Sequence, residues 1–357
     1  MKRVSVLSYG VFLLFMSLNV VSPGLLELNI KVGVFFYVWY DPKDSTSWRY
    51  PKIHDKPVLG HYNSCDPEVI KQHLKWISDA YIDFIVICWY GYTSYKFIND
   101  TAHQVFEVAK NVSTNVKLCI AVEPFNETEN GYDYAGIYNY VWNNFVKPYE
   151  PFYFHYQGKP LLLFYQGKYL VQNGNFPKND TFTIELFGHE EYCTWVYGYA
   201  EELRVDGPYP RNRQFSVMPR YDETSIPNRT RQHCIDPRLE YLYVEQWEEA
   251  LKLASRGAID IITITSWNEF PERTAIEPHY DSTAWNKNPY YLYDLTRTYI
   301  CKLKGIDPQV QENTKDNLKL LTVLGTLCIA VILGLFLGRQ KLRLKRRLLR
   351  TTPHSAA

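Results

Sequence analysis

Residues 260–269 read DIITITSWNE, and this stretch is typical of a buried strand that ends on polar side chains. Residues 261–265 are all β-branched, which favours an extended backbone. Continuously apolar, β-rich runs suit strands that are covered on both faces, as in a parallel sheet. Seven more runs of this kind lie at 32–40, 84–90, 116–125, 160–166, 181–188, 193–200 and 215–221.

Helical patterns separate several of these runs, at 66–80, 101–111 and 244–257. In the first of them, Asp66 suits the N-cap and Pro67 suits the first helical position, and Gly257 suits the C-cap of the last. Eight strands that alternate with helices over about 250 residues predict an α/β fold, the (β/α)8 TIM barrel. We assign this barrel to residues 30–305.

The first residues of the chain have the layout of a secretory signal. Residues 1–23 begin with two cations and continue with an apolar run and then small and turn-forming residues, which predicts a signal peptide or an uncleaved N-terminal anchor.

The other end of the chain predicts a membrane span. Residues 320–338 are apolar and uncharged, and as a helix they would extend about 29 Å, close to the thickness of a bilayer core. The tail that follows, 339–357, carries seven basic residues and no acid between 339 and 350. By the positive-inside rule the tail is cytoplasmic. The sequence therefore predicts a single-pass type I membrane protein, with a juxtamembrane linker at 306–319 and an extracellular or luminal barrel.

Composition narrows the functional classes further. The formal charge is +1, so the chain without its basic tail is net acidic, and nothing in the barrel suggests a nucleic-acid partner. Aromatic residues make up 16% of the chain, including 30 Tyr and 9 Trp, which fits both a large core and a carbohydrate site. No glycine-rich phosphate loop occurs and the histidines lack metal-ligand spacing, so we expect no cofactor and no metal.

Two features fit an oxidising compartment. Five N-x-S/T sequons lie between the hydrophobic ends, at Asn99, Asn111, Asn126, Asn179 and Asn228. Seven cysteines occur, and Cys328 lies in the predicted span. The other six could form disulfides in an oxidising compartment. Cys88 and Cys119 lie in predicted strands, where plain buried thiols are the alternative.

Candidate functional residues gather where the predicted strands end, which is where TIM barrels place their active sites. Glu269 and Glu272 lie three positions apart, and a helical step after Asn268 would point both to the same side. Two acids flanked by Trp and Tyr are what glycosidic bond cleavage requires, because one carboxyl protonates the leaving oxygen and the other handles charge or a proton at the sugar. The alternative is that they are ordinary solvent-facing loop acids.

The stretch ITSWNEFPERTAIEP (264–278) resembles the ITSxNEWxEGTxIE segment of glycoside hydrolase family 99, the endo-α-1,2-mannosidase family. Further segments resemble that family in the same order, from about residue 32 to 300: FFYVWY (35–40), PVLGHYNSCDPEVIKQHL (57–74), VICWY (86–90), AVEPF (121–125) and VMPRYDET (217–224).

The resemblance implies a retaining, endo-acting hydrolase of α-mannose-containing glycans. In that family a carboxylate deprotonates the 2-hydroxyl of the sugar, which attacks C1, and a second carboxyl protonates the leaving group. By position, Glu269 is the base and Glu272 is the general acid/base. Residues that match the family's subsites, or that are aromatic at the same strand ends, are expected to bind substrate: Glu123, Trp89, Tyr90, Tyr37, Tyr40, Tyr221, Asn268 and Trp267.

The chain also departs from the family pattern. Pro271 replaces a histidine, Arg273 replaces a glycine, and the loop at 41–55 is shortened. WbsX-type carbohydrate-active barrels have similar strings and are a second resemblance. Two other functions stay open: a non-catalytic surface carbohydrate-binding protein on a degenerate barrel, and a glycosyl-transferring relative.

Overall fold

The computed structural model describes residues 30–43, 48, 55–93, 95–112, 114–123, 133–165, 179–188, 192–198, 210–224, 226, 232–233, 240–281, 286–307 and 329. The chain divides into two compact units, residues 1–305 and residues 306–357. The fold described below is that of the first unit.

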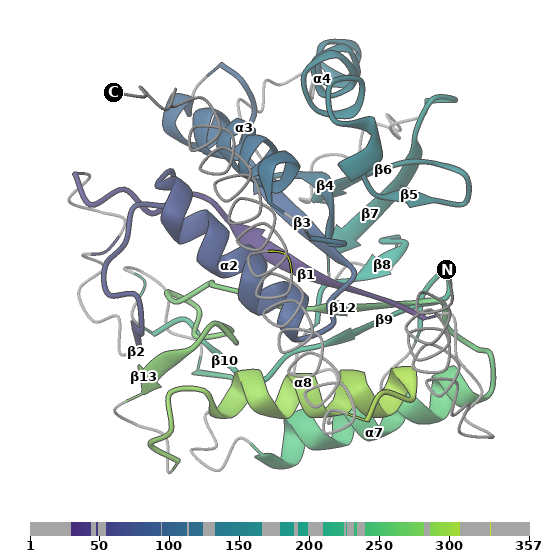
Figure 1. Ribbon diagram of the computed structural model, residues 1–357. Coiled ribbons are helices and arrows are strands. Elements are labelled where there is room, and N and C mark those ends of the chain that lie inside the picture. The colour runs from purple at the N-terminus through teal and green to yellow at the C-terminus, as the bar shows by residue number, and fades with distance from the viewer. Residues whose placement is uncertain are drawn as a thin grey trace, which may run out of the picture. The chain divides into compact units, whose positions relative to one another are not determined.

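The first unit is built on a parallel sheet of eight strands that curves into a nearly closed barrel (Figure 1). Along the sheet the strands are β8 (Trp195–Val196), β7 (Thr183–Gly188), β6 (Lys159–Tyr165), β4 (Lys117–Val122), β3 (Phe84–Trp89), β1 (Lys31–Tyr37), β12 (Ile261–Ile264) and β9 (Gln214–Val217). The predicted TIM-barrel fold is consistent with this sheet.

Side chains bridge the two ends of the sheet. The amide of Gln214 on β9 accepts from the backbone nitrogen of Val196 at 2.8 Å and donates to its carbonyl at 3.0 Å. Ser216 accepts from the nitrogen of Gly198 at 2.9 Å. Hydrogen bonds from the side chains of Gln214 and Ser216 thus replace backbone pairing between β9 and the short strand β8.

Helices cover the outside of the sheet. Helix α2 (Pro67–Asp79) and helix α3 (Lys96–Asn111) follow β2 and β3, and α7 (Glu240–Ser255) and α8 (Tyr291–Lys304) run side by side (Figure 1). The three predicted helices are confirmed, and α3 begins earlier than predicted. Shorter elements are α4 (Tyr134–Val141), a π-helical turn η1 (Trp142–Val146), a 3₁₀ turn η2 (Glu150–Phe152) and β5 (His155–Tyr156).

Two small two-stranded sheets lie outside the barrel sheet. Strands β2 (Asp55–Pro57) and β13 (His279–Asp281) pair antiparallel, as do β10 (Tyr221–Asp222) and β11 (Gln232–His233). The strand predicted at 260–269 is shorter than expected, because the chain leaves the barrel sheet after Ile264.

The predicted membrane segments are not tested by this structure. Within the part of the chain that the structure describes, no helix is both long enough and apolar enough to cross a bilayer. The predicted span 320–338 lies outside the described residues apart from Ile329, and segments 1–23 and 339–357 lie wholly outside them. Of the linker 306–319 only Ile306 and Asp307 are described.

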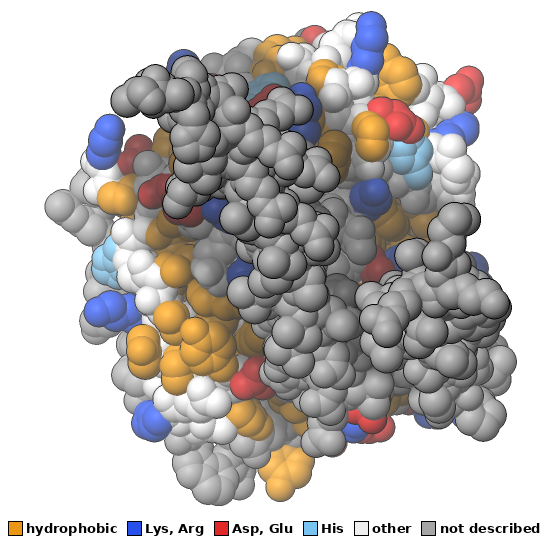
Figure 2. Space-filling model, viewed as in Figure 1, with side chains coloured by type: hydrophobic (Ala, Val, Ile, Leu, Met, Phe, Trp, Pro, Cys, Tyr) orange, Lys and Arg blue, Asp and Glu red, His pale blue; other side chains and the backbone are white. Residues whose placement is uncertain are grey.

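Charged side chains of both signs are dispersed over the described part of the face shown in Figure 2. The buried thiols expected at Cys88 and Cys119 are confirmed, since both are free and buried.

Gly33 leaves room for an aromatic ring to pack against strand β1. A Cβ at this position would lie 2.3 Å from Cζ of Phe84 on β3, and the Phe84 ring stacks on Phe154 at a centroid distance of 3.9 Å. The absence of a side chain at Gly33 therefore lets β1 and β3 share one packed ring layer.

We expect Gly33→Ala to destabilise the fold by about 1–3 kcal/mol, because the added methyl group overpacks a rigid core. Denaturant unfolding measures this loss. Combining it with Phe84→Leu should be less than additive, because the shorter side chain relieves the clash. Additive losses would mean that Phe84 is not the source of the strain.

Candidate active site

The candidate site lies where strands β1, β3, β4 and β12 end. Tyr37 is the last residue of β1, and Glu123 follows β4 directly, with its backbone nitrogen 2.9 Å from the carbonyl oxygen of Trp89 on β3. Glu269 and Glu272 follow β12. These strands are neighbours and parallel, so their carboxyl ends meet at one end of the barrel.

Three acids of this end of the barrel act electrostatically on Tyr90. Burial raises the pKa of Tyr90 well above its ordinary value, and the charges of Glu123, Glu269 and Glu272 raise it further. The pKa of Tyr37 is raised in the same way, first by burial and also by Glu123 and Glu269. The predicted pair thus belongs to a group of three carboxyl groups at the mouth.

Glu123 is the most perturbed of these acids for which a shift is resolved. Its side chain is 6% exposed, and burial raises its pKa to about 8, against a hydrogen bond from Cys88 and with help from the charge of Glu272. At neutral pH this carboxyl is therefore mostly protonated.

The two predicted catalytic acids sit on a turn instead of the helical step that the sequence suggested. The backbone nitrogen of Arg273 donates to the carbonyl of Phe270 at 3.0 Å, which closes the turn around Glu272. The nitrogen of Glu269 donates to the Ser266 hydroxyl at 2.8 Å. Glu269 is buried and Glu272 is half-buried.

Aromatic rings continue from the acids towards solvent. The ring of Trp39 lies 4.5 Å from that of Tyr37 and 5.9 Å from that of Tyr90, and Tyr90 lies 5.6 Å from Tyr95, which is 48% exposed. Tyr197 donates to or accepts from the Tyr37 hydroxyl at 2.6 Å. Trp39, Tyr95 and Tyr197 are candidate site residues that the sequence did not predict. Trp39 and Tyr197 lie at strand ends, which was a usable signal, whereas Tyr95 had none.

Several residues expected to bind substrate are placed in the core. The ring of Trp89 is fully buried, stacks on Tyr140 at 5.6 Å, and donates from Nε1 to Asn99 at 3.0 Å. Trp267 is fully buried with its ring 5.9 Å from His73 and 6.4 Å from Tyr293 of α8. Both rings pack against the helix layer.

Asn268 and Tyr40 connect the strand ends through buried hydrogen bonds. The Asn268 amide nitrogen donates to the carbonyl of Tyr37 at 2.8 Å, and its oxygen accepts from the nitrogen of Tyr37 at 2.8 Å. The Tyr40 hydroxyl donates to the Asn268 carbonyl at 2.6 Å. Both side chains are fully buried, so here they position the strand ends. Tyr221 is half-buried, and its hydroxyl donates to Glu223 at 2.6 Å.

Glu277 supports the loop from inside the protein. It is fully buried, accepts from the Tyr62 hydroxyl at 2.8 Å, and pairs with His73 of α2 at 3.3 Å. His73 is 2% exposed and is therefore a core histidine.

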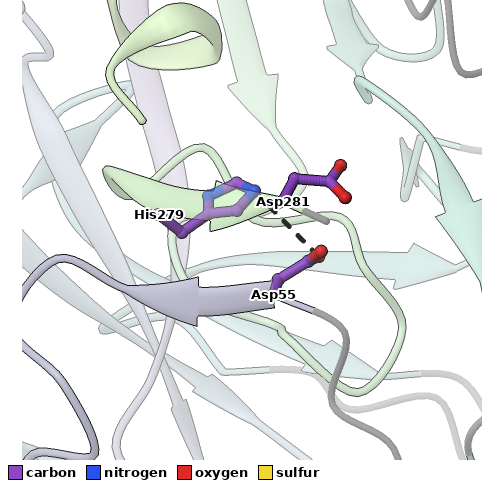
Figure 3. A group of neighbouring side chains, drawn as sticks. All are labelled: Asp55, His279 and Asp281. Carbon is purple, nitrogen blue, oxygen red and sulfur yellow. Dashed lines mark ion pairs between the residues drawn. The ribbon is translucent and has the colours of Figure 1, made fainter. Parts of the chain in front are cut away.

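One group of side chains has the geometry of a metal site. Asp55, His279 and Asp281 place possible ligand atoms within 4.8 Å of one another (Figure 3). Two guanidinium groups already neutralise them, because Arg220 and Arg273 each contact both Asp55 and Asp281. We therefore interpret the group as an ion-pair network and not as a metal centre.

Histidine 279 is neutral in that network. Its Nδ1 lies 2.6 Å from the carbonyl of Glu277 and so carries the hydrogen, while Nε2 accepts from Arg220 at 3.3 Å. Burial lowers the pKa of His279, and Arg220 lowers it further against the opposing charge of Asp55.

The described sequons differ in how accessible their amides are. The side-chain nitrogen of Asn99 donates to the Tyr140 hydroxyl at 2.9 Å, inside a cluster with Trp89, which argues against a glycan there. Asn111 donates to the carbonyl of Glu107 at 2.8 Å at the exposed end of α3, and Asn179 accepts from Thr181 at 2.8 Å. Asn126 and Asn228 lie outside the described residues.

Comparison with known proteins agrees with the barrel fold. The family model described as glycosyl hydrolase family 99 matches residues 42–179. Two solved structures of the family 99 endo-alpha-mannosidase from Bacteroides thetaiotaomicron, one of them in complex with bis-tris-propane, match with TM-scores of 0.59 and 0.58. Their identities are 18% and 20%, and each match covers 77% of this chain and 97% of the other.

A further structure, described as a glycoside hydrolase-like protein, has a TM-score of 0.50 and 14% identity, and the match covers 78% of this chain and 96% of the other. No curated protein matches the chain. The fold and the family model define a glycoside hydrolase built on a TIM-type barrel. Within that class, the family-model match over residues 42–179 supports the resemblance to glycosyl hydrolase family 99 that the motifs indicated.

The raised pKa of Glu123 predicts a pH-dependent stability. An unfolded glutamate ionises near pH 4.5 and the folded Glu123 near pH 8, so the folded state binds the extra proton between these values. Its stabilising contribution is complete below about pH 4.5 and is lost as the pH rises to about 8. We expect Glu123→Gln to lose less stability than the wild type across this window, by a few kcal/mol.

Thermal or denaturant unfolding between pH 4 and 9 measures the difference. Glu245→Gln on the exposed side of α7 is the matched control and should follow the wild type. Parallel pH profiles for Glu123→Gln and the wild type would contradict the assignment of a protonated Glu123.

Proposed function

We propose that this protein is a membrane-anchored, retaining glycoside hydrolase that cleaves within α-mannose-containing glycans. The family-model match over residues 42–179 supports hydrolysis of a glycosidic bond. The observation that carries the finer proposal is that Glu123, Glu269 and Glu272 all follow strands of one parallel sheet at the carboxyl end of the barrel, where their charges raise the pKa of Tyr90. The family-model match ends at residue 179, so the roles of Glu269 and Glu272 rest on this geometry and on their motif.

In the first step Glu269 acts as a base on the sugar. Its carboxylate takes the proton of the 2-hydroxyl, the oxygen attacks C1, and the bond from C1 to the leaving oxygen breaks. Glu272, protonated, donates its proton to that oxygen. The products are the departing glycan and a 1,2-anhydro sugar.

In the second step each acid reverses its proton transfer. The Glu272 carboxylate takes a proton from water, which attacks C1, and the bond between C1 and O2 breaks. Glu269 returns its proton to O2. Two displacements at C1 retain the anomeric configuration. A protonated Glu123 beside the pair adds a hydrogen-bond donor without a further negative charge.

The row of rings from Tyr37 through Trp39 and Tyr90 to Tyr95 supports an oligosaccharide substrate. Sugar rings stack on aromatic faces, and a row that begins beside the acids and ends in solvent suits a chain longer than one residue. This arrangement favours endo action.

The proposed anchor is the apolar segment 320–338 with its basic tail. A catalytic unit tethered at its C-terminal side would face the lumen or the exterior, where glycans are attached and trimmed.

We expect Glu269→Gln and Glu272→Gln each to lower hydrolysis of a defined mannose oligosaccharide by about 10²–10⁴-fold, because each removes a proton-transfer group. The thermal midpoint should stay close to that of the wild type. Glu245→Gln, a surface change of the same kind, should keep full activity.

The products separate the alternatives. Release of oligosaccharide with the retained anomer, followed by mass and NMR, is expected, whereas full activity of both Gln variants would overturn the roles. Sugar binding by the wild type without any turnover would favour the non-catalytic binding protein. Products elongated only when acceptor glycans are present would favour a transferase.

We expect the double substitution Leu327→Arg and Val331→Arg in the full-length chain to release it from the membrane fraction, since each charge costs about 2.5–3.5 kcal/mol at the centre of a span. Alkaline carbonate extraction measures this. The matched Ala substitutions at both positions should leave the chain in the membrane pellet, and an arginine variant that stays there would contradict anchoring by 320–338.

A further inference from the structure

Arg273 directly follows Glu272 and adopts a backbone conformation that usually selects glycine. Its φ is 58°, in the left-handed region where a Cβ is disfavoured. The family motif that this segment resembles has glycine at the same position. The chain therefore combines a left-handed backbone at residue 273 with a long charged side chain, and the contacts of that side chain indicate its role.

The guanidinium of Arg273 is buried among three carboxylates. The side chain is 2% exposed, and its nitrogens lie 3.0 Å from Asp281, 3.2 Å from Asp55 and 3.3 Å from Asp222. A buried guanidinium is tolerated only when it is paired and hydrogen-bonded, and here it is paired on all three sides.

A second arginine locks the backbone of the turn. Arg220 pairs with Asp55 and Asp281, and its Nε donates to the carbonyl oxygen of Arg273 at 2.7 Å. Asp55 and Asp281 come from the paired strands β2 and β13 (Figure 3). The network thus joins this pair of strands to the loop that carries the acids.

Asp222 connects the network to Glu272 itself. Its backbone nitrogen donates to the carbonyl oxygen of Glu272 at 2.9 Å, and its carboxylate accepts from Arg273 at 3.3 Å. Removing the Arg273 side chain would release the residue that holds the Glu272 backbone.

We propose that Arg273 is a positioning residue that holds Glu272 in its productive orientation through Asp222, Asp55 and Asp281. This inference rests on the proposed function, in which Glu272 is the general acid/base. Arg273 does not touch the substrate.

Two variants and one control test this role in the full-length chain. Arg273→Gly keeps the left-handed turn and removes the side chain, and Arg273→Lys keeps the charge without the forked geometry. Arg213→Gly is the matched control, because Arg213 also has a positive φ of 62° and an ion pair, with Asp260, but precedes β9 at the other end of the barrel.

We expect Arg273→Gly to lower kcat about 10–100-fold with little change in KM, because a small displacement of a catalytic group is enough to do so. The pH–rate profile should shift on the limb set by the general acid. Arg273→Lys should be intermediate, and Arg213→Gly should match the wild type in kcat and pH profile.

A second measurement does not depend on turnover. In ¹³C-glutamate-labelled protein, the carboxyl signal of Glu272, identified by its loss in Glu272→Gln, should titrate with a changed midpoint in Arg273→Gly and Arg273→Lys. It should be unchanged in Arg213→Gly.

The outcomes separate the two proposals. An active wild type with unchanged kcat, pH profile and Glu272 titration in both Arg273 variants would overturn the positioning role alone. If Arg273→Gly fails to fold, Arg273→Lys decides by the same criteria. An inactive wild type would overturn the proposed function, and the Glu272 titration would then still decide whether Arg273 positions it.

Discussion

The amide of Asn268 continues the pairing of β1 and β12 beyond the point where their backbones part. The ladder between the strands ends at Val34 and Ile264, after which the Asn268 side chain both donates to and accepts from the backbone of Tyr37 at 2.8 Å. A carboxylate could accept there but could not donate to the carbonyl, so aspartate would leave a buried acceptor without a partner. Glu269 follows this junction directly, and its position at the mouth depends on it.

Burial then determines the protonation of Glu123. Loss of solvent, with a further contribution from the negative charge of Glu272, raises the pKa of this carboxyl to about 8. The surrounding groups are mostly phenols, such as Tyr37 and Tyr197, which share a hydrogen bond of 2.6 Å. The ring of a tyrosine packs like that of a phenylalanine, and its hydroxyl group still forms hydrogen bonds. The tyrosine-rich composition is thus partly explained by a mouth that has to be both packed and polar.

The sequence predicted the barrel well because its strands are buried on both faces and read as long apolar runs. It predicted the acids because polar residues at strand ends stand out against such runs. It could not tell that Trp89 and Trp267 pack against the helix layer, because an aromatic residue at a strand end faces that layer or the mouth according to the twist of the strand, which the residue type does not encode.

Tertiary contacts explain the remaining differences. The step after Asn268 is a turn because Asp222, Ser266 and the Asn268 junction fix its backbone, and these partners lie up to 231 residues away along the chain. Tyr95 lacked any signal, since its place in the aromatic row depends on Tyr90 and Trp39 and not on its neighbours in sequence. Asn99 has a complete sequon, yet its amide serves Trp89 and Tyr140.

The ion network around Arg273 is difficult to explain by stability. Two guanidiniums and three carboxylates beside a neutral histidine must all be desolvated, and apolar side chains of similar volume stabilise a core equally well or better. Charged groups differ from apolar ones in direction, because each guanidinium nitrogen fixes the angle of its partner as well as its distance. Here the fixed partners include the carbonyl of Arg273 and, through Asp222, that of Glu272. The network loses free energy through desolvation and in exchange fixes the orientation of its partners. Such a network is most useful beside a group whose orientation determines the rate of a reaction.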